Sequence, residues 1–190
     1  MLNSPMTSAL PGSNENSPDL ATLIALFYSN CRDLGKFEAI TSEQMPATAR
    51  LLLAHDAHMT VTVEAFHHCK VNVEVLDRKR EADHYSRRIL LRRATDQKVV
   101  LFGIPRLDMR AIPKPALDAI LSETIPLGQA LIDNSVLRRV ELCHLWKVIA
   151  GPELAKLMSI TEGDVVYGRT AMIHVDHQPA IELLEIVTDC

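Results

Sequence analysis

Two pairs of apolar segments, each joined by a short polar turn, constrain the fold of this chain more than any other feature. In the first pair, HYSRRILLRR (residues 84–93) and KVVLFGIPRL (98–107) flank the turn ATDQ. In the second pair, YGRTAMIHV (167–175) and PAIELLEIV (179–187) flank DHQ. Parallel strands need long crossover connections, so strands joined by turns this short pair in the antiparallel direction. The sequence therefore predicts an antiparallel sheet.

Two further segments show the alternation of residue types that is typical of strands. They are MTVTVEAF (residues 59–66) and KVNVEV (70–75), and HHC (67–69) is the expected bend between them. The charged run DRKREAD (77–83) is expected to form a loop before the next strand. These segments bring the number of expected strands to about six.

Helices are expected before and between the strands. Ser17, Pro18 and Asp19 form a typical helix start, with a capping hydroxyl followed by proline and an acid. The expected helices are one from this start to Gly35, one from about Pro46 through 47–56, and two within 113–132 separated at Pro126. Helices packed on an antiparallel sheet define the α+β fold class. We expect one domain over residues 18–190, after a disordered leader (1–17) that is rich in Ser, Asn and Pro.

Charge and cysteine content argue against several classes of function. The net charge is −4, so the chain has no excess of basic residues to neutralise nucleic-acid phosphates. Its four cysteines form no CxxC pair and the sequence shows no secretion signal, which predicts reduced thiols in a cytoplasmic protein. No apolar run approaches the roughly 20 residues of a membrane helix. The histidines, including His55 and His58, match no known ligand spacing, so no metal site is expected.

Four arginines surround an Ile-Leu-Leu core in the segment of residues 84–93. A period of two places Arg87 on the same face as two aliphatic residues, Ile89 and Leu91. A buried arginine keeps its charge and needs an anion, so Arg87 is a candidate for binding a ligand carboxylate. The alternative is an edge strand whose arginines extend into solvent.

Two glutamates and one turn are further candidates for a site. Glu182 and Glu185 lie on opposite faces of the last strand, each among aliphatic residues, so the alternation does not choose between them. Such a glutamate tends to have a raised pKa, which suits proton transfer, although an ion pair with an arginine is the alternative. Pro126 and Gly128 fix the entry to a short helix, which is either an anion site or an ordinary loop-to-helix junction.

Several short motifs, taken in order, resemble those of the chorismate pyruvate-lyase family and its wider relatives. They are HMT after a leucine-rich helix, SRRILL, PLG followed by NSVLRR, YGR, and the closing PAIELLEIV. The resemblance runs from about Leu51 to Val187 and implies a chorismate lyase-like domain. Enzymes of this family split chorismate into 4-hydroxybenzoate and pyruvate.

The resemblance also implies the residues of a site. Arg87 corresponds to the arginine that holds the ring carboxylate, and Leu127, followed by Gly128, to the residue whose backbone amide helps bind it. Met59 would line the far end of the pocket, and Glu185 would face the hydroxyl. The resemblance thus implies Arg87 and Glu185 as catalytic residues, with no metal or organic cofactor.

The chain departs from the family pattern at two positions. Arg88 stands where the family has a glutamate. Counted from Pro179, Glu185 lies one residue later than in the family, and a one-residue slip reverses the face of a strand unless a bulge or a longer turn absorbs it. Glu182 is therefore the alternative to Glu185.

The resemblance leaves three functions open. The first is a lyase that converts chorismate to 4-hydroxybenzoate and pyruvate. The second is a non-catalytic module that binds an aromatic acid, because the same fold resembles the ligand-sensing domain of GntR-type bacterial repressors. The third is a family enzyme that releases 3-hydroxybenzoate. In each case the partner is a small aromatic or dicarboxylic acid, and the sequence leaves the oligomeric state open.

Overall fold

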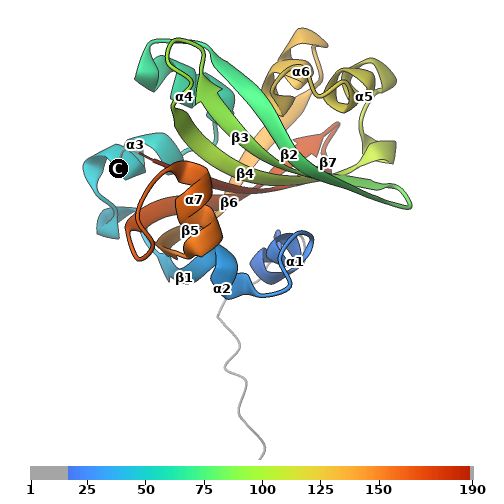
Figure 1. Cartoon of the computed structure of the whole chain (residues 1–190). Coiled ribbons are helices and arrows are strands. Elements are labelled where there is room, and N and C mark those ends of the chain that lie inside the picture. Colours follow the sequence, from blue (N-terminus) through green and yellow to red (C-terminus); the bar gives the residue numbers. More distant parts are fainter. Residues whose placement is uncertain (1–16, 189–190) are drawn as a thin grey trace, which may run out of the picture.

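A seven-stranded antiparallel sheet forms the centre of the computed structural model, which describes residues 17–188 (Figure 1). The strands are β1 (Gly35–Ile40), β2 (Val71–Glu81), β3 (His84–Arg93), β4 (Val99–Asp108), β5 (Arg138–Ala150), β6 (Val165–Val175) and β7 (Gln178–Val187). Their order in the sheet is β1-β5-β6-β7-β4-β3-β2. The predicted α+β class is confirmed, with seven strands in place of about six. Residues 1–16 of the predicted leader lie outside the described part of the chain.

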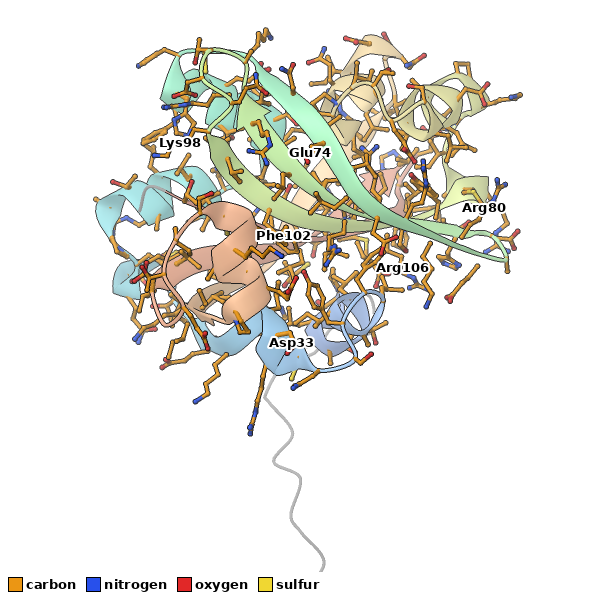
Figure 2. The ribbon with its side chains drawn as sticks, viewed as in Figure 1. Asp33, Glu74, Arg80, Lys98, Phe102 and Arg106 are labelled. Carbon is orange, nitrogen blue, oxygen red and sulfur yellow. The ribbon has the colours of Figure 1, made fainter. Side chains whose placement is uncertain are left out.

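Helices cover both faces of this sheet. They are α1 (Leu20–Ala25), α2 (Cys31–Leu34), α3 (Ala47–Leu53), α4 (Met59–His67), α5 (Lys114–Leu121), α6 (Leu127–Asp133) and α7 (Pro152–Met158), with short 3-10 turns at Ser42–Gln44 and Met109–Ala111. Helices α1, α2 and α7 pack on one face, where Phe102 of β4 lies beside α7 (Figure 2). On the other face, α3 and α4 form one core cluster and α5 and α6 form a second. No helix among residues 17–188 is long and apolar enough to cross a membrane.

Alternation along β7 distributes its side chains between the two faces. Leu184 and Ile186 join the core under α1, α2 and α7. Leu183 and Val187 point the other way, toward the clusters that contain α6 and α3. Because Glu185 lies between Leu183 and Val187 in this pattern, the face with two separate helical clusters is the one that receives its carboxylate.

The prediction of a strand over residues 59–66 is wrong, because this segment forms helix α4. Its buried residues include Met59 and Val63, four apart, whereas Val61 of the expected strand face is 48% exposed. The β-branched residues favour a strand locally, but packing of one helical face against the sheet outweighs that preference. The helix ends at His67 and is capped by His68, which has left-handed backbone angles, so the expected bend joins a helix to a strand.

The prediction of a loop over residues 77–83 is also wrong, because β2 continues to Glu81. Its second half pairs with β3 through Glu81 and His84, leaving a two-residue turn. Strand β2 lies at the edge of the sheet, so its charged side chains reach solvent while the backbone stays paired. Figure 2 shows Arg80 near the end of this hairpin, away from the main body of the sheet.

The N-terminal helix is shorter than predicted, and two strands were not predicted at all. Helix α1 starts after Asp19, which caps it in place of Ser17, and ends at Ala25. Gly35 ends the separate helix α2 and starts strand β1. Its φ of 150° favours glycine, and a Cβ there would lie 2.4 Å from the Ile149 carbonyl oxygen. The other missed strand, β5, contains an irregularity between Leu142 and His144 that interrupts its alternation.

The remaining boundaries agree with the sequence. Helix α3 begins after Pro46, and helices α5 and α6 are separated by a segment that ends at Pro126. Strands β3 and β4 are joined at residues 94–98, and β6 and β7 at Asp176 and His177.

Candidate functional site

A cavity lies where the cluster of α3 and α4 meets the cluster of α5 and α6. Its apolar lining includes Ile89, Leu91, Leu101, Val140, Ile173 and Leu183. The volume of the cavity, counted as the space that the centres of water molecules can occupy, is about 40 Å³. A single water needs about 10–15 Å³ on this measure, so the space suits a small ring or a short chain. We call it the Arg87 cavity, after the charged residue described next.

Arg87 contributes a buried positive charge to this cavity. Its side chain is 0% exposed, and Nη1 donates a hydrogen bond of 3.3 Å to the carbonyl oxygen of Ile120 at the end of α5. The Nε and Nη2 atoms are buried without a hydrogen-bond partner among residues 17–188. Burial lowers the pKa of the guanidinium, but arginine remains charged in proteins. Arg87 therefore presents two donor nitrogens to the cavity, and no acidic side chain among residues 17–188 forms an ion pair with it.

Glu123 is an acid whose charge acts on Arg87, but its carboxylate is bound by two other residues. Its carboxylate accepts a hydrogen bond of 2.6 Å from the Tyr85 hydroxyl and forms an ion pair of 2.5 Å with Arg78. The Tyr85 hydrogen bond lowers the pKa of Glu123 and, together with Arg78, keeps it ionised, whereas burial raises the pKa of Tyr85 to about 12. Glu123 thus screens Arg87 from nearby without forming an ion pair with it.

A second buried arginine, Arg169 of β6, is fully paired. It lies directly opposite Glu185 in the β6–β7 ladder, and its Nε donates to that carboxylate at 2.7 Å. Nη1 donates to the carbonyl oxygen of His55 at 2.8 Å, and Nη2 to that of Ala57 at 3.1 Å. Arg169 therefore fixes the Glu185 carboxylate on the cavity wall and ties the segment between α3 and α4 to the sheet.

The structure separates the two candidate glutamates by face. Glu185 lines the Arg87 cavity, whereas Glu182 pairs at 2.7 Å with Arg106 and lies outside it. In the ladder, Ile181 pairs with Ile173 but Pro179 pairs with His174, so Ala180 is an extra residue in β7. This bulge lies between Pro179 and Glu185, so the extra residue changes which face Glu185 occupies when the strand is counted from Pro179.

The other predicted site residues line the same cavity. Met59 begins α4, and Leu127 and Gly128 begin α6, and all three contribute to the wall. Arg88, on the opposite face from Arg87, donates to the Tyr28 hydroxyl at 3.1 Å and takes no part in the cavity. The specific roles of Arg87, Leu127, Met59 and Glu185 remain predictions. Among residues 17–188, no group of three or more His, Cys, Asp or Glu is arranged to hold a metal ion.

Three polar wall residues were given no role by the sequence. They are His58, Thr60 and Arg169. His58 and Thr60 flank Met59 in the motif HMT, and Arg169 belongs to the motif YGR. Their place within these motifs was the one feature of the sequence that could have indicated a role in the site. Alternation could not place His58 and Thr60, because it assigned this segment to a strand.

His58 predicts a pH dependence of stability. Burial, with Arg138 and Arg169 nearby, lowers its pKa to about 4, against 6.5 for an unperturbed histidine. The unfolded chain therefore takes up the proton first, and the free energy of unfolding falls as the pH decreases from about 6.5 to about 4. We expect a loss of about 1–3 kcal/mol, the lower end allowing for solvent screening of a partly exposed ring.

Urea unfolding of wild type and His58→Gln at pH 7.5 and 4.5 measures this effect. The stability difference between the two pH values should be smaller in the variant by about that amount. His84→Gln, which alters a histidine outside the cavity, should retain the wild-type difference. Equal pH dependence in wild type and His58→Gln would show that His58 is not the responsible group.

Comparisons with known proteins show the fold class of the chain. The sequence matches no protein-family model and no curated protein, but the structure is similar to solved structures of bacterial proteins. One is PhnF from Mycobacterium smegmatis, with a TM-score of 0.55 and 9% sequence identity, covering 70% of this chain and 64% of that one. Another is the ligand-binding domain of a proposed GntR-family transcriptional regulator from Bordetella bronchiseptica, with a TM-score of 0.49, 16% identity and coverage of 63% and 86%. The likeness to PhnF, at this identity, concerns the fold alone.

Proposed function

We propose that this protein binds a small aromatic monocarboxylic acid in the Arg87 cavity. The observation that carries the proposal is the fully buried Arg87, with two nitrogens, Nε and Nη2, that lack a hydrogen-bond partner among residues 17–188. Buried polar groups are paired in the great majority of proteins, and an unpaired buried charge is costly. A ligand carboxylate would supply the missing charge and accept both hydrogen bonds.

Charge and lining support the ligand class. The ionised side chains on the cavity wall are Arg87, Arg169 and Glu185, which together carry a net charge of +1. Since Arg169 and Glu185 neutralise each other, one carboxylate balances the site better than two. The aliphatic wall suits an apolar ring, and the volume favours a single ring over a larger molecule.

Titration calorimetry with 4-hydroxybenzoate tests this proposal. We expect binding with a dissociation constant of about 10–100 µM, in the range open to a ligand of this size. The neutral analogue 4-hydroxybenzamide should bind at least about tenfold more weakly, because it lacks the charge that Arg87 requires. The proposal fails if the acid does not bind, or if the amide binds as tightly as the acid.

Lyase activity on chorismate is the second candidate function. Glu185 favours it, because a carboxylate held on the wall of the same cavity could take part in proton transfer. Against it, one oxygen of this carboxylate already accepts a 2.7 Å hydrogen bond from the Arg169 guanidinium. Incubation with chorismate decides between the two: the lyase releases pyruvate with 4- or 3-hydroxybenzoate, whereas the binding module releases none.

A further inference from the structure

His58 is held in one tautomer by a neighbouring arginine. The Nε of Arg138 lies 2.7 Å from the Nε2 of His58. A guanidinium can only donate, so Nε2 must be the unprotonated nitrogen that accepts. Burial also disfavours a charged ring at this position. The proton of the neutral imidazole is therefore on Nδ1.

Thr60 presents a second donor beside this one. Its side chain is 6% exposed, and its hydroxyl has no hydrogen-bond partner among residues 17–188. Both groups face Gly128 across the cavity wall, because a Cβ on Gly128 would lie 3.2 Å from Thr60 Oγ1 and 3.4 Å from His58 Nδ1. The missing side chain of Gly128 thus leaves open the space that these two donors share.

These donors and Arg87 reach the cavity from different elements of the fold. Arg87 comes from β3 and bonds to the end of α5, whereas His58 comes from the start of α4 and bonds to β5. Strands β4, β7 and β6 separate β3 from β5 in the sheet. A ligand anchored by its carboxylate on Arg87 can therefore offer a different atom to His58 and Thr60.

We propose that His58 and Thr60 determine ligand specificity by donating hydrogen bonds to a second, uncharged oxygen of the acid. This inference rests on the proposed function and narrows the ligand to a monocarboxylic acid with a hydroxyl or carbonyl oxygen. The second oxygen is uncharged because both donors are neutral and Glu185, on the same wall, repels another anion. Arg138 is a positioning residue, since it acts on the ligand only through the tautomer of His58.

Paired substitutions separate the donors from the shape of the cavity. His58→Gln places its amide near the Nε2 position and loses the donor at Nδ1, whereas His58→Asn keeps an amide N–H near Nδ1. Thr60→Val removes the hydroxyl at nearly constant volume, and Thr60→Ser restores it. We expect His58→Gln and Thr60→Val each to weaken hydroxybenzoate binding about 5- to 15-fold, with most of the affinity recovered in the Asn and Ser variants.

Benzoate serves as the ligand control, because it lacks the second oxygen. Wild type should bind 3- or 4-hydroxybenzoate more tightly than benzoate, and His58→Gln should lose that preference, because its affinity for hydroxybenzoate falls more than its affinity for benzoate. Imidazole ¹⁵N shifts, assigned by the signal missing in His58→Gln, should show a protonated Nδ1 and a bare Nε2.

The outcomes separate this inference from the proposed function. If wild type binds none of the three acids, the proposed function fails and the inference fails with it. If the acids bind but His58→Gln keeps the preference for hydroxybenzoate, only the inference is overturned. An Nε2–H tautomer at pH 7 overturns it whatever the affinities are.

Discussion

Replacing Arg87 by methionine is expected to stabilise the ligand-free protein and to abolish its binding of 4-hydroxybenzoate. The buried guanidinium makes one long hydrogen bond and leaves two donors without partners among residues 17–188. The free energy needed to remove it from water is therefore offset by little hydrogen bonding in the folded protein. A methionine removes that cost and keeps the packing of the apolar part of the arginine side chain, although it is shorter by the end of the guanidinium. We expect the free energy of unfolding to rise by about 1–3 kcal/mol, which raises Tm by about 2–12 °C in a chain of this size.

Binding should change in the opposite direction. Removing the charged partner of a buried carboxylate costs about 2–5 kcal/mol, so the affinity should fall at least about 30-fold. Urea unfolding and calorimetry on the same samples measure both effects. Arg88→Met, on the other face of β3, is the matched control and should leave binding unchanged. A variant that loses stability along with binding would show that Arg87 has a structural role.

Replacing Arg169 by methionine is expected to have the opposite effect on stability, although Arg169 is equally buried. Its guanidinium pairs with Glu185 and donates to the carbonyl oxygens of His55 and Ala57. The substitution leaves a carboxylate and two carbonyl groups without their donors. We expect the free energy of unfolding to fall by about 3–5 kcal/mol, the range found when one partner of a buried pair is removed.

A double variant shows how much of this loss comes from the uncompensated carboxylate. Arg169→Met combined with Glu185→Leu removes both charges, and we expect it to recover about 1–3 kcal/mol relative to Arg169→Met alone. The segment between α3 and α4 should stay loosened in both variants, which amide hydrogen exchange at residues 55–58 measures. If the double variant is no more stable than the single one, the ion pair is not what makes Arg169 important.

The sequence was sufficient where local patterns and structure agree. Strand β3 matches residues 84–93, because its apolar core is followed by a short polar turn. The break at Pro126 and the start after Pro46 follow from the fixed backbone of proline. The position of Arg87 among aliphatic residues on one face of β3 was likewise readable from a period of two.

The sequence was insufficient where a contact with a distant segment overrides a local preference. The segment of residues 59–66 alternates like a strand, yet it forms α4 because Met59 and Val63 pack together on the sheet. The extension of β2 through its charged residues depends on pairing with β3, which no local pattern records.

The sequence by itself determined the antiparallel α+β class, the strand that carries Arg87, and the two glutamates between which alternation could not choose. Only the tertiary structure decided that Arg87 forms no ion pair with an acid among residues 17–188, that a bulge at Ala180 accompanies Glu185 on the cavity face, and that His58 accepts a hydrogen bond from Arg138. The physical reason is the separation along the chain over which each interaction acts. Side-chain alternation and turn chemistry act between neighbours in the chain, whereas the pairing of a buried charge depends on residues brought together only by the folded sheet.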